Sequence, residues 1–343
     1  MGAMTTRREL LLSIPALVAV RSIRGADASF LRIDTHTHTH KHVPALIDSL
    51  EKGNWKLLSI CDSREVGDEK SVLQEMTEGT IDAVKQSRGR LAWCTTFDAR
   101  YFEDKDFTSR AIARVKAHFG QGAIAVKIWK NIGMAIQSKK GDYLLPDHSS
   151  LLPIYDAIQK ADRTLIAHLA DPNGMWEPPR TDRPTTSPAW WNRYGRPGTP
   201  SKEEILLARD RVLAKYPKLR VVGCHIGSNE QDLDRVAKRL DTYPNFAVDL
   251  ASRVRYLTAE PEKGKQFLLK YQDRIVYGTD TSPARAEGGA QSLENTHDRE
   301  WNILASNGAV LDQKGSSPGF GLPESVLKKI FHDNAARWIQ GLG

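Results

Sequence analysis

The sequence predicts a barrel of eight parallel strands surrounded by helices, a (β/α)8 barrel of the TIM type. Short apolar runs recur along the chain, and segments with the 3.6-residue periodicity of helices separate them. This alternation indicates parallel strands with crossover helices, and eight repeats favour a closed barrel over an open sheet. The expected strands are residues 30–35, 55–61, 90–97, 122–129, 163–169, 219–226, 245–250 and 274–280.

The length fits one such domain. A barrel needs roughly 250 residues, so a chain of 343 residues leaves room for long loops, and we place the single domain at residues 29–343. The helix expected at 203–215 has a local start signal, because Ser201 and Glu204 have the spacing of a capping box.

The segment 171–200, just before that helix, is too rich in proline and glycine for a helix and too long for an ordinary connection. Its aromatic side chains need packing partners. We therefore expect an ordered loop over the mouth of the active site. The aromatic residues are Trp176, Trp190, Trp191 and Tyr194.

The first 28 residues resemble an export signal. Arg7 and Arg8 precede an apolar run at 10–20, and a small-x-small pattern ends at Ala28. The run is shorter than the about 20 residues that cross a bilayer, so we expect no permanent membrane anchor. The paired arginines are typical of a twin-arginine signal, which predicts cleavage, a bacterial twin-arginine export machinery as partner, and a periplasmic or other extracytoplasmic location. The alternative is an N-terminal helix of a cytosolic protein.

The charge distribution indicates the class of ligand, and the cysteine positions indicate the state of the thiols. The net charge is +7, but basic residues are scattered among acidic ones and no nucleic-acid-binding motif occurs, so we expect a small-molecule substrate, anionic in character, and no nucleic acid. Cys61, Cys94 and Cys224 each lie inside an apolar run, which predicts buried free thiols. Assembly into a homo-oligomer is left open.

Histidines at the end of the first strand give the sharpest functional signal. His36 and His38 are two residues apart, so on a strand they project to the same side and can hold one metal ion. A solvent-facing histidine tract is the alternative, but catalytic residues of such barrels gather at the carboxyl ends of strands. His40 and His42 follow as expected loop residues.

Three later strands also end in a residue whose side chain can bind a metal ion. His168, His225 and Asp280 each follow an apolar run, and the carboxyl ends of parallel strands share one face. This set predicts a catalytic site for one divalent metal ion, most simply Zn2+, with Mn2+ or Fe2+ as alternatives. A bound zinc ion lowers the pKa of water to about 7, and Asp280 could accept the proton of that water.

These motifs resemble the amidohydrolase superfamily, in particular its amidohydrolase-related (amidohydrolase 2) branch of metal-dependent hydrolases and decarboxylases. The resemblance spans nearly all of residues 29–343. It implies His36, His38, His168 and Asp280 as metal ligands, with His225 either a ligand or a partner of the substrate and its developing charge. The matching motifs include Asp34, Gly227, Gly278, and the closing segment Asn334 to Arg337.

Other strand ends offer groups for an anionic substrate. Lys127 occupies the fourth strand, where some branches of the superfamily carry a carboxylated lysine between two metals; it could instead bind a substrate carboxylate or point outward. Arg64, Trp129 and Arg253, with Lys130, follow the second, fourth and seventh strands.

The predicted activity is hydrolysis of an ester, lactone or amide bond by metal-activated water, with His225 stabilising the oxyanion. One alternative is non-oxidative decarboxylation of an unsaturated or aromatic acid, which an arginine placed for the carboxylate would favour. The other is an exported metal-binding protein without catalysis.

Overall fold

The structure is a computed structural model that describes residues 28–179, 191–312 and 315–343. The predicted export signal at residues 1–28 lies outside these ranges except for its last residue. Within the described residues, no helix combines the length and the apolar composition needed to cross a membrane.

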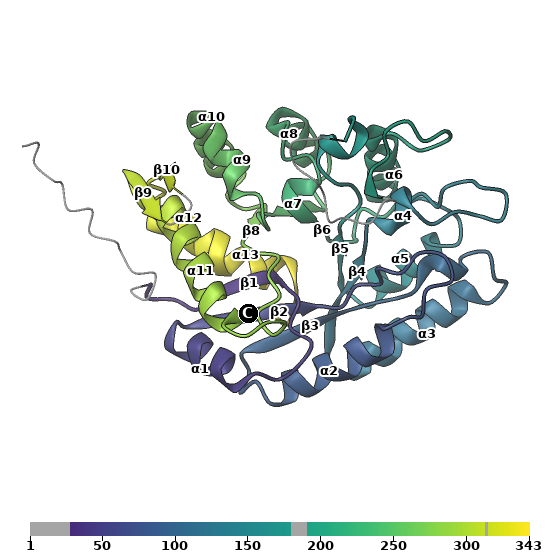
Figure 1. Cartoon of the computed structure of the whole chain (residues 1–343), viewed down its shortest axis with the longest axis horizontal. Coiled ribbons are helices and arrows are strands. Elements are labelled where there is room, and N and C mark those ends of the chain that lie inside the picture. The colour runs from purple at the N-terminus through teal and green to yellow at the C-terminus, as the bar shows by residue number, and fades with distance from the viewer. Residues whose placement is uncertain (1–27, 180–190, 313–314) are drawn as a thin grey trace, which may run out of the picture.

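Eight parallel strands form one sheet in the order β1 to β8, with helices around it, which confirms the predicted (β/α)8 TIM barrel (Figure 1). Each strand pairs in parallel with the next along the chain. The strands are β1 (Arg32–Thr37), β2 (Trp55–Ile60), β3 (Leu91–Thr96), β4 (Ala123–Ile128), β5 (Thr164–Ala167), β6 (Val221–Gly223), β7 (Phe246–Asp249) and β8 (Ile275–Val276).

The barrel closes through the residues that follow β8. The amide of Thr35 donates to the carbonyl of Tyr277 at 2.9 Å, and the amide of Asp280 donates to the carbonyl of His36 at 2.7 Å. A parallel bridge between Thr37 and Thr281 continues this contact. Closure therefore places Asp280 beside the histidine-bearing end of β1.

The expected strands at 219–226 and 274–280 were too long. His225, Ile226 and Asp280 have positive φ values of 59°, 55° and 62°, so the chain leaves the extended conformation before them. The first strand, in contrast, runs two residues beyond its expected end and includes His36.

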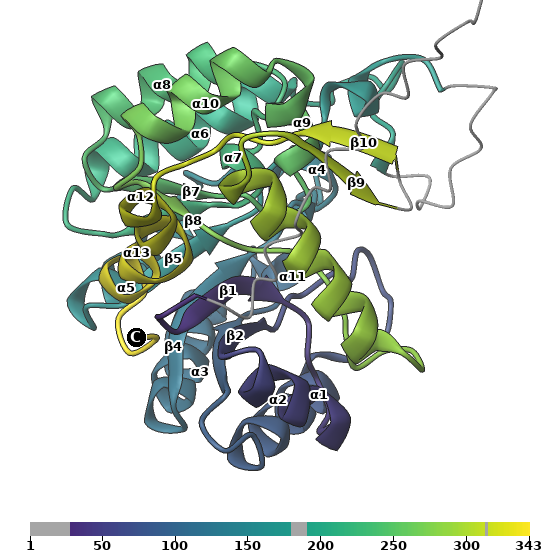
Figure 2. The same ribbon diagram turned by 90° about the vertical axis from the view of Figure 1, so that its left-hand side faces the viewer.

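Helices between the strands cover the outside of the barrel (Figure 2). Ser201 and Glu204 form the predicted capping box at the start of α6. The helices and helical turns are α1 (Pro44–Lys52), α2 (Leu73–Lys85), η2 (Ala99–Tyr101), α3 (Phe107–Gly120), α4 (Asn131–Met134), α5 (Leu152–Lys160), η3 (Asn173–Trp176), α6 (Lys202–Lys215), α7 (Cys224–Gly227), α8 (Leu233–Thr242), α9 (Val254–Ala259), α10 (Pro261–Lys270), α11 (Gly289–Ala305), α12 (Glu324–Lys328), η5 (Lys329–Asp333) and α13 (Asn334–Trp338).

One element was not expected from the sequence. An antiparallel hairpin of β9 (Ala309–Asp312) and β10 (Gly315–Pro318) follows α11 and lies outside the barrel (Figures 1 and 2). Each strand has only four residues, and β10 consists of glycine, serine and proline, so it lacks the apolar pattern that marks the barrel strands.

Alternate residues of a strand belong to different apolar clusters. Leu57 and Leu165 belong to the cluster shared with the helices, whereas their neighbours Leu58 and Ile166 belong to the second cluster, inside the barrel. Trp338 of α13 also packs in this second cluster. The three cysteines are buried and free, as predicted.

Candidate metal centre and active site

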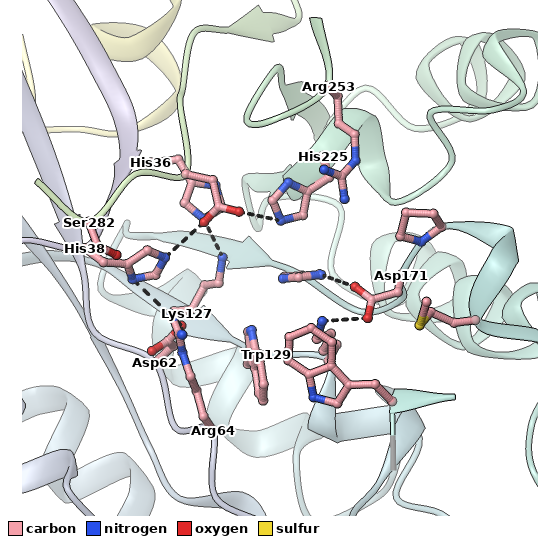
Figure 3. A pocket seen from close by; sticks show the side chains of 16 residues that line it. His36, His38, Asp62, Arg64, Lys127, Trp129, Asp171, His225, Arg253 and Ser282 are labelled. Atoms are coloured by element: carbon pink, nitrogen blue, oxygen red, sulfur yellow. Dashed lines mark hydrogen bonds and ion pairs between the residues drawn. The ribbon is translucent and has the colours of Figure 1, made fainter. Parts of the chain in front are cut away.

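A cavity of about 370 Å³ opens at the carboxyl ends of the strands. The structure brings all of the predicted site residues to its walls (Figure 3). They are His36, His38, Arg64, Lys127, Trp129, His168, His225, Arg253 and Asp280.

Asp280 lies at the centre of a histidine cluster. Its Oδ1 is 3.2 Å from His38 Nε2 and 3.5 Å from His36 Nε2, and its Oδ2 is 3.9 Å from His225 Nε2. Burial opposes its ionisation, but the three histidines outweigh this effect and hold the pKa of Asp280 well below its ordinary value. Its side chain is still 31% exposed, so an ionised carboxylate faces the cavity.

The three histidines of this cluster are oriented by hydrogen bonds at Nδ1. Each Nδ1 lies beside an oxygen that can only accept, so Nδ1 carries the proton and Nε2 presents a lone pair to the cavity. This is the arrangement in which imidazole binds a metal ion. The acceptors are Oδ2 of Asp249 for His36 at 2.8 Å, the carbonyl of Ile60 for His38 at 3.0 Å and the carbonyl of Ala251 for His225 at 2.8 Å.

The donor set fits a divalent metal ion. Ligand atoms of His36, His225 and Asp280 all lie within 4.8 Å of one another, and His38 Nε2 contacts the same carboxylate. Imidazole nitrogen and carboxylate oxygen are ligands that Zn2+, Mn2+ and Fe2+ share. The chain therefore contains a candidate metal centre at the predicted position.

His168 is beside this cluster but is oriented differently. Its ring centroid is 4.3 Å from that of His225, while its Nε2 lies 3.3 Å from Oδ1 of Asp171. Burial lowers the pKa of His168 well below its ordinary value, so it is neutral. The geometry favours His225 over His168 as a ligand, and the ligand role of His168 stays a prediction.

Asp249, at the end of β7, is an important residue that the sequence interpretation did not assign. Besides His36, it accepts from the backbone amides of His225 at 2.6 Å and Ala251 at 3.1 Å through Oδ1. Burial opposes ionisation, but its histidine neighbours prevail and lower the pKa of Asp249 to about 2. The signal that found Asp280, a polar residue where an apolar strand ends, also applied to Asp249.

Lys127 points into the barrel from β4 and is 1% exposed. Its Nζ donates to Cys224 Sγ at 2.9 Å and lies 3.5 Å from His36 Nε2. The lysine thus lies at the bottom of the candidate metal centre, and the outward orientation considered for it is wrong.

Cations and indole rings form the walls around the cluster. Arg64 and Arg253 lie on opposite sides of the cavity (Figure 3). Lys130 Nζ lies 3.2 Å from the ring centroid of Trp191, and the rings of Trp129 and Trp191 meet edge to face at 6.1 Å. Cations and flat apolar surfaces together suit a planar, anionic ligand.

Each of these cations has a carboxylate partner that the sequence did not identify. Arg64 binds Asp62 at 2.8 Å, Lys130 binds Asp171 at 2.6 Å, and Arg253 Nε lies 3.5 Å from Glu230. Asp62 is only two residues from Arg64, but Asp171 and Glu230 lie on other loops than Lys130 and Arg253, so no local pattern marks those two pairs.

The described ends of the loop expected at 171–200 reach the cavity. Pro172, Met175 and Trp191 line it, and the indole nitrogen of Trp176 donates to the carbonyl of Pro200 at 3.0 Å. Residues 180–190, which include Trp190, lie outside the described residues. The described ends of the loop therefore lie at the mouth of the cavity, as expected.

His40 lies outside the metal cluster, as expected for a loop residue. Its Nδ1 is 2.8 Å from Thr80 Oγ1. Burial, with a smaller contribution from His38, lowers the pKa of His40 to about 4.

The fold and the site define a TIM-barrel protein with a cluster of histidines and a carboxylate, a candidate metal centre, at the carboxyl end of its strands. The sequence model described as amidohydrolase matches residues 33–340, and the chain belongs to this family of metal-dependent enzymes. A search of curated proteins gave no match.

Several solved structures have the same fold. An uncharacterized TIM-barrel protein from Bordetella bronchiseptica superposes with a TM-score of 0.58 at 14% identity, covering 90% of this chain and 98% of that chain. A 2,6-dihydroxybenzoate decarboxylase from Rhizobium gives 0.53 at 13% identity, covering 91% and 100%. A putative 2-pyrone-4,6-dicarboxylic acid hydrolase from Pseudomonas putida gives 0.52 at 12% identity, covering 90% and 97%. At these identities the similarity concerns the fold alone.

Proposed function

We propose that the protein is a metal-dependent hydrolase that cleaves an ester, lactone or amide bond in a small anionic substrate. The observation that carries this proposal is the position of Asp280. Its carboxylate contacts the Nε2 atoms of His36 and His38 and is partly exposed to the cavity, so it can serve both the metal ion and a water molecule.

One divalent ion, Zn2+ in our proposal, would be held by His36, His38, His225 and Asp280. Such an ion lowers the pKa of water to about 7 and polarises a carbonyl group. The side chain of Asp280 is 31% exposed to the cavity, so its carboxylate can accept a hydrogen bond, and then the proton, from a water molecule there.

His225 is better suited to bind the metal than to donate to an oxyanion. Its Nδ1 hydrogen is used by the carbonyl of Ala251, which leaves an unprotonated Nε2 on the cavity side. We therefore replace its predicted oxyanion role by a ligand role. Arg64, Lys130 and Arg253 would orient the negative charge of the substrate.

Decarboxylation of an aromatic acid is the second candidate, because Trp129 and Trp191 provide flat surfaces beside the cations. In both candidate reactions the negative charge of the substrate would face the same paired cations, Arg64, Lys130 and Arg253, so the assay decides between the two reactions. Release of CO2 from a panel of carboxylated aromatic acids, without hydrolysis of ester or lactone panels, would establish it instead.

The proposed role of Asp280 predicts the effect of Asp280→Asn. We expect kcat/KM for the best ester or lactone substrate to fall by about 100-fold or more, because the amide cannot accept the proton. Metal content, measured by elemental analysis, should fall much less than the rate. Asp241→Asn is the control, because that carboxylate is 56% exposed on α8 and does not line the cavity. Full activity in Asp280→Asn would refute the role.

Removing a proposed ligand should lower both the metal content and the rate of hydrolysis. We expect His36→Ala to lose both the bound ion and hydrolysis, because His36 Nε2 belongs to the ligand group. A His36→Ala protein that keeps a full equivalent of metal would show that the ion binds elsewhere.

We also propose that residues 1–28 direct export, on the strength of Arg7, Arg8 and the apolar run that follows. Replacing both arginines by lysine should keep the protein in the cytoplasmic fraction of a bacterial host. Unchanged recovery from the periplasm would contradict a twin-arginine route.

A further inference from the structure

A second cavity, which we call the side cavity, adjoins the one that holds the metal cluster. Its volume is about 490 Å³, and it shares His38, Asp62, Arg64 and Ser282 with the first cavity. The loops after β1, β2 and β8 enclose it. It therefore begins at His38, beside the histidine cluster, and Trp129 and Trp191 do not line it.

The side cavity has an apolar wall and a basic rim. Val72, Met76 and Ala284 provide the wall, and Val72 is 51% exposed although it is apolar. Lys41 and Arg285 are exposed at the rim. Apolar side chains from separate segments that converge on one hollow, with a few charged groups, are the usual composition of a small-molecule site.

The boundary between the two cavities is fixed. Asp62 holds Arg64 through both Nε and Nη2, each at 2.8 Å. His38, on the same boundary, has its Nε2 3.2 Å from Asp280. Because His38 lines both cavities and contacts Asp280, a substrate bound beside Asp280 can extend into both cavities, with one half in each.

We propose that the side cavity binds the leaving group of the substrate, and that this group is an apolar ring with an anionic substituent. The inference rests on the proposed hydrolysis. Water adds its oxygen to the acyl carbon, the bond from that carbon to the leaving oxygen or nitrogen breaks, and the leaving group departs with a proton. The ring contacts Val72 and Met76, and the anionic substituent faces Lys41 and Arg285. The volume lies within the range of about 300 to 1,000 Å³ found for small-molecule sites.

The first test compares benzyl and methyl esters of one acid with the metal-loaded protein. Val72→Trp fills the side cavity from its exposed edge, so the preference for benzyl over methyl in kcat/KM should fall by about tenfold. Leu207→Trp is the control, because Leu207 is 45% exposed on α6 and lines neither cavity. An unchanged preference in Val72→Trp would overturn the proposal.

The second test needs no catalysis. Anilinonaphthalene sulfonate combines apolar rings with an anion, and its fluorescence reports binding. We expect Val72→Trp and Lys41→Glu each to raise its dissociation constant about tenfold or more, with Leu207→Trp unchanged. Absence of probe binding to the unaltered protein, or equal binding by all variants, would overturn the side-cavity proposal.

The two tests separate the two proposals. If no ester, lactone or amide is hydrolysed but Val72→Trp abolishes probe binding, the hydrolase proposal fails and the binding property of the side cavity stands. If Val72→Trp fails to fold, as judged by thermal unfolding, Met76→Trp takes its place in both tests, because Met76 lies on the same wall.

Discussion

Asp249 shows how a single residue can organise this site. One of its carboxylate oxygens accepts from His36 Nδ1, and the other accepts from the amides of His225 and Ala251. It therefore fixes one proposed ligand through its side chain and another through its backbone. A carboxylate that holds a ligating histidine raises the basicity of the ring and fixes its orientation.

Asp249→Asn should weaken metal binding. The amide group has only one acceptor oxygen, so it cannot serve both His36 and His225, and we expect metal affinity to fall by about 10- to 100-fold. Competition with a chelator measures this change. Asp210→Asn is a matched control, because Asp210 is also a buried carboxylate but pairs with Arg209 and Arg239 away from the cavity. Equal affinities in Asp249→Asn and the unaltered protein would contradict the role.

Two residues of the site have a strained backbone conformation. His225 and Asp280 have the left-handed conformation, which is rare for residues with a side chain. Each such residue costs on the order of 1 kcal/mol. The conformation ends the strand and points the side chain at the cluster. The strained residues are therefore ones that the proposed function uses.

At the scale of elements, α6 follows the loop that reaches the cavity, and its start is fixed by a local motif. The Ser201 side chain accepts from the amide of Glu204, and the Glu204 carboxylate accepts from the amide of Ser201 at 2.7 Å. The sequence predicted this start because both partners are three residues apart. The hydrogen bonds also tie the end of the loop to the helix.

Ser201→Ala should lower the free energy of unfolding by about 1 kcal/mol, because it leaves an amide of the first turn without its acceptor. Urea denaturation at neutral pH measures the loss. Ser325→Ala is the control, an exposed serine of α12 for which the structure shows no capping bond. The interpretation would be wrong if both variants lost the same amount.

At the scale of the whole molecule, His118 makes stability depend on pH. It lies buried on α3, with Nδ1 beside Thr95 Oγ1 of β3. Burial, and to a lesser degree Arg114, lower its pKa from 6.5 to about 4. Between these values the unfolded chain binds a proton that the folded chain does not, so stability is lost as the pH falls from 6.5 to 4.

His118→Asn keeps a polar atom near Nδ1 and removes the titration. We expect the unfolding free energy of the unaltered protein to fall by up to about 3 kcal/mol more than that of the variant between pH 7 and pH 4. Urea denaturation at a series of pH values gives the two curves. Parallel curves would show that His118 does not contribute.

Much of this architecture was predictable because it depends on local patterns. The alternation of apolar runs and helical periodicity specified the barrel, and the polar residues at the strand ends specified which face carries the site. His36, His168, His225 and Asp280 could be placed on one face because parallel strands end on the same side. The sequence by itself determined the class of fold, the position of the site and the types of group that it contains.

Only the tertiary structure decided which of these groups act together. Asp249 and His36 are 213 residues apart, and the pairs of Arg253 with Glu230 and Lys130 with Asp171 depend on how loops meet at the mouth. The turn at His225 and the closure of the barrel beside Asp280 are likewise set by contacts between strands. The physical reason is that a hydrogen bond or an ion pair requires atoms within about 3 to 4 Å, and only the folded backbone sets those distances between residues far apart in the chain.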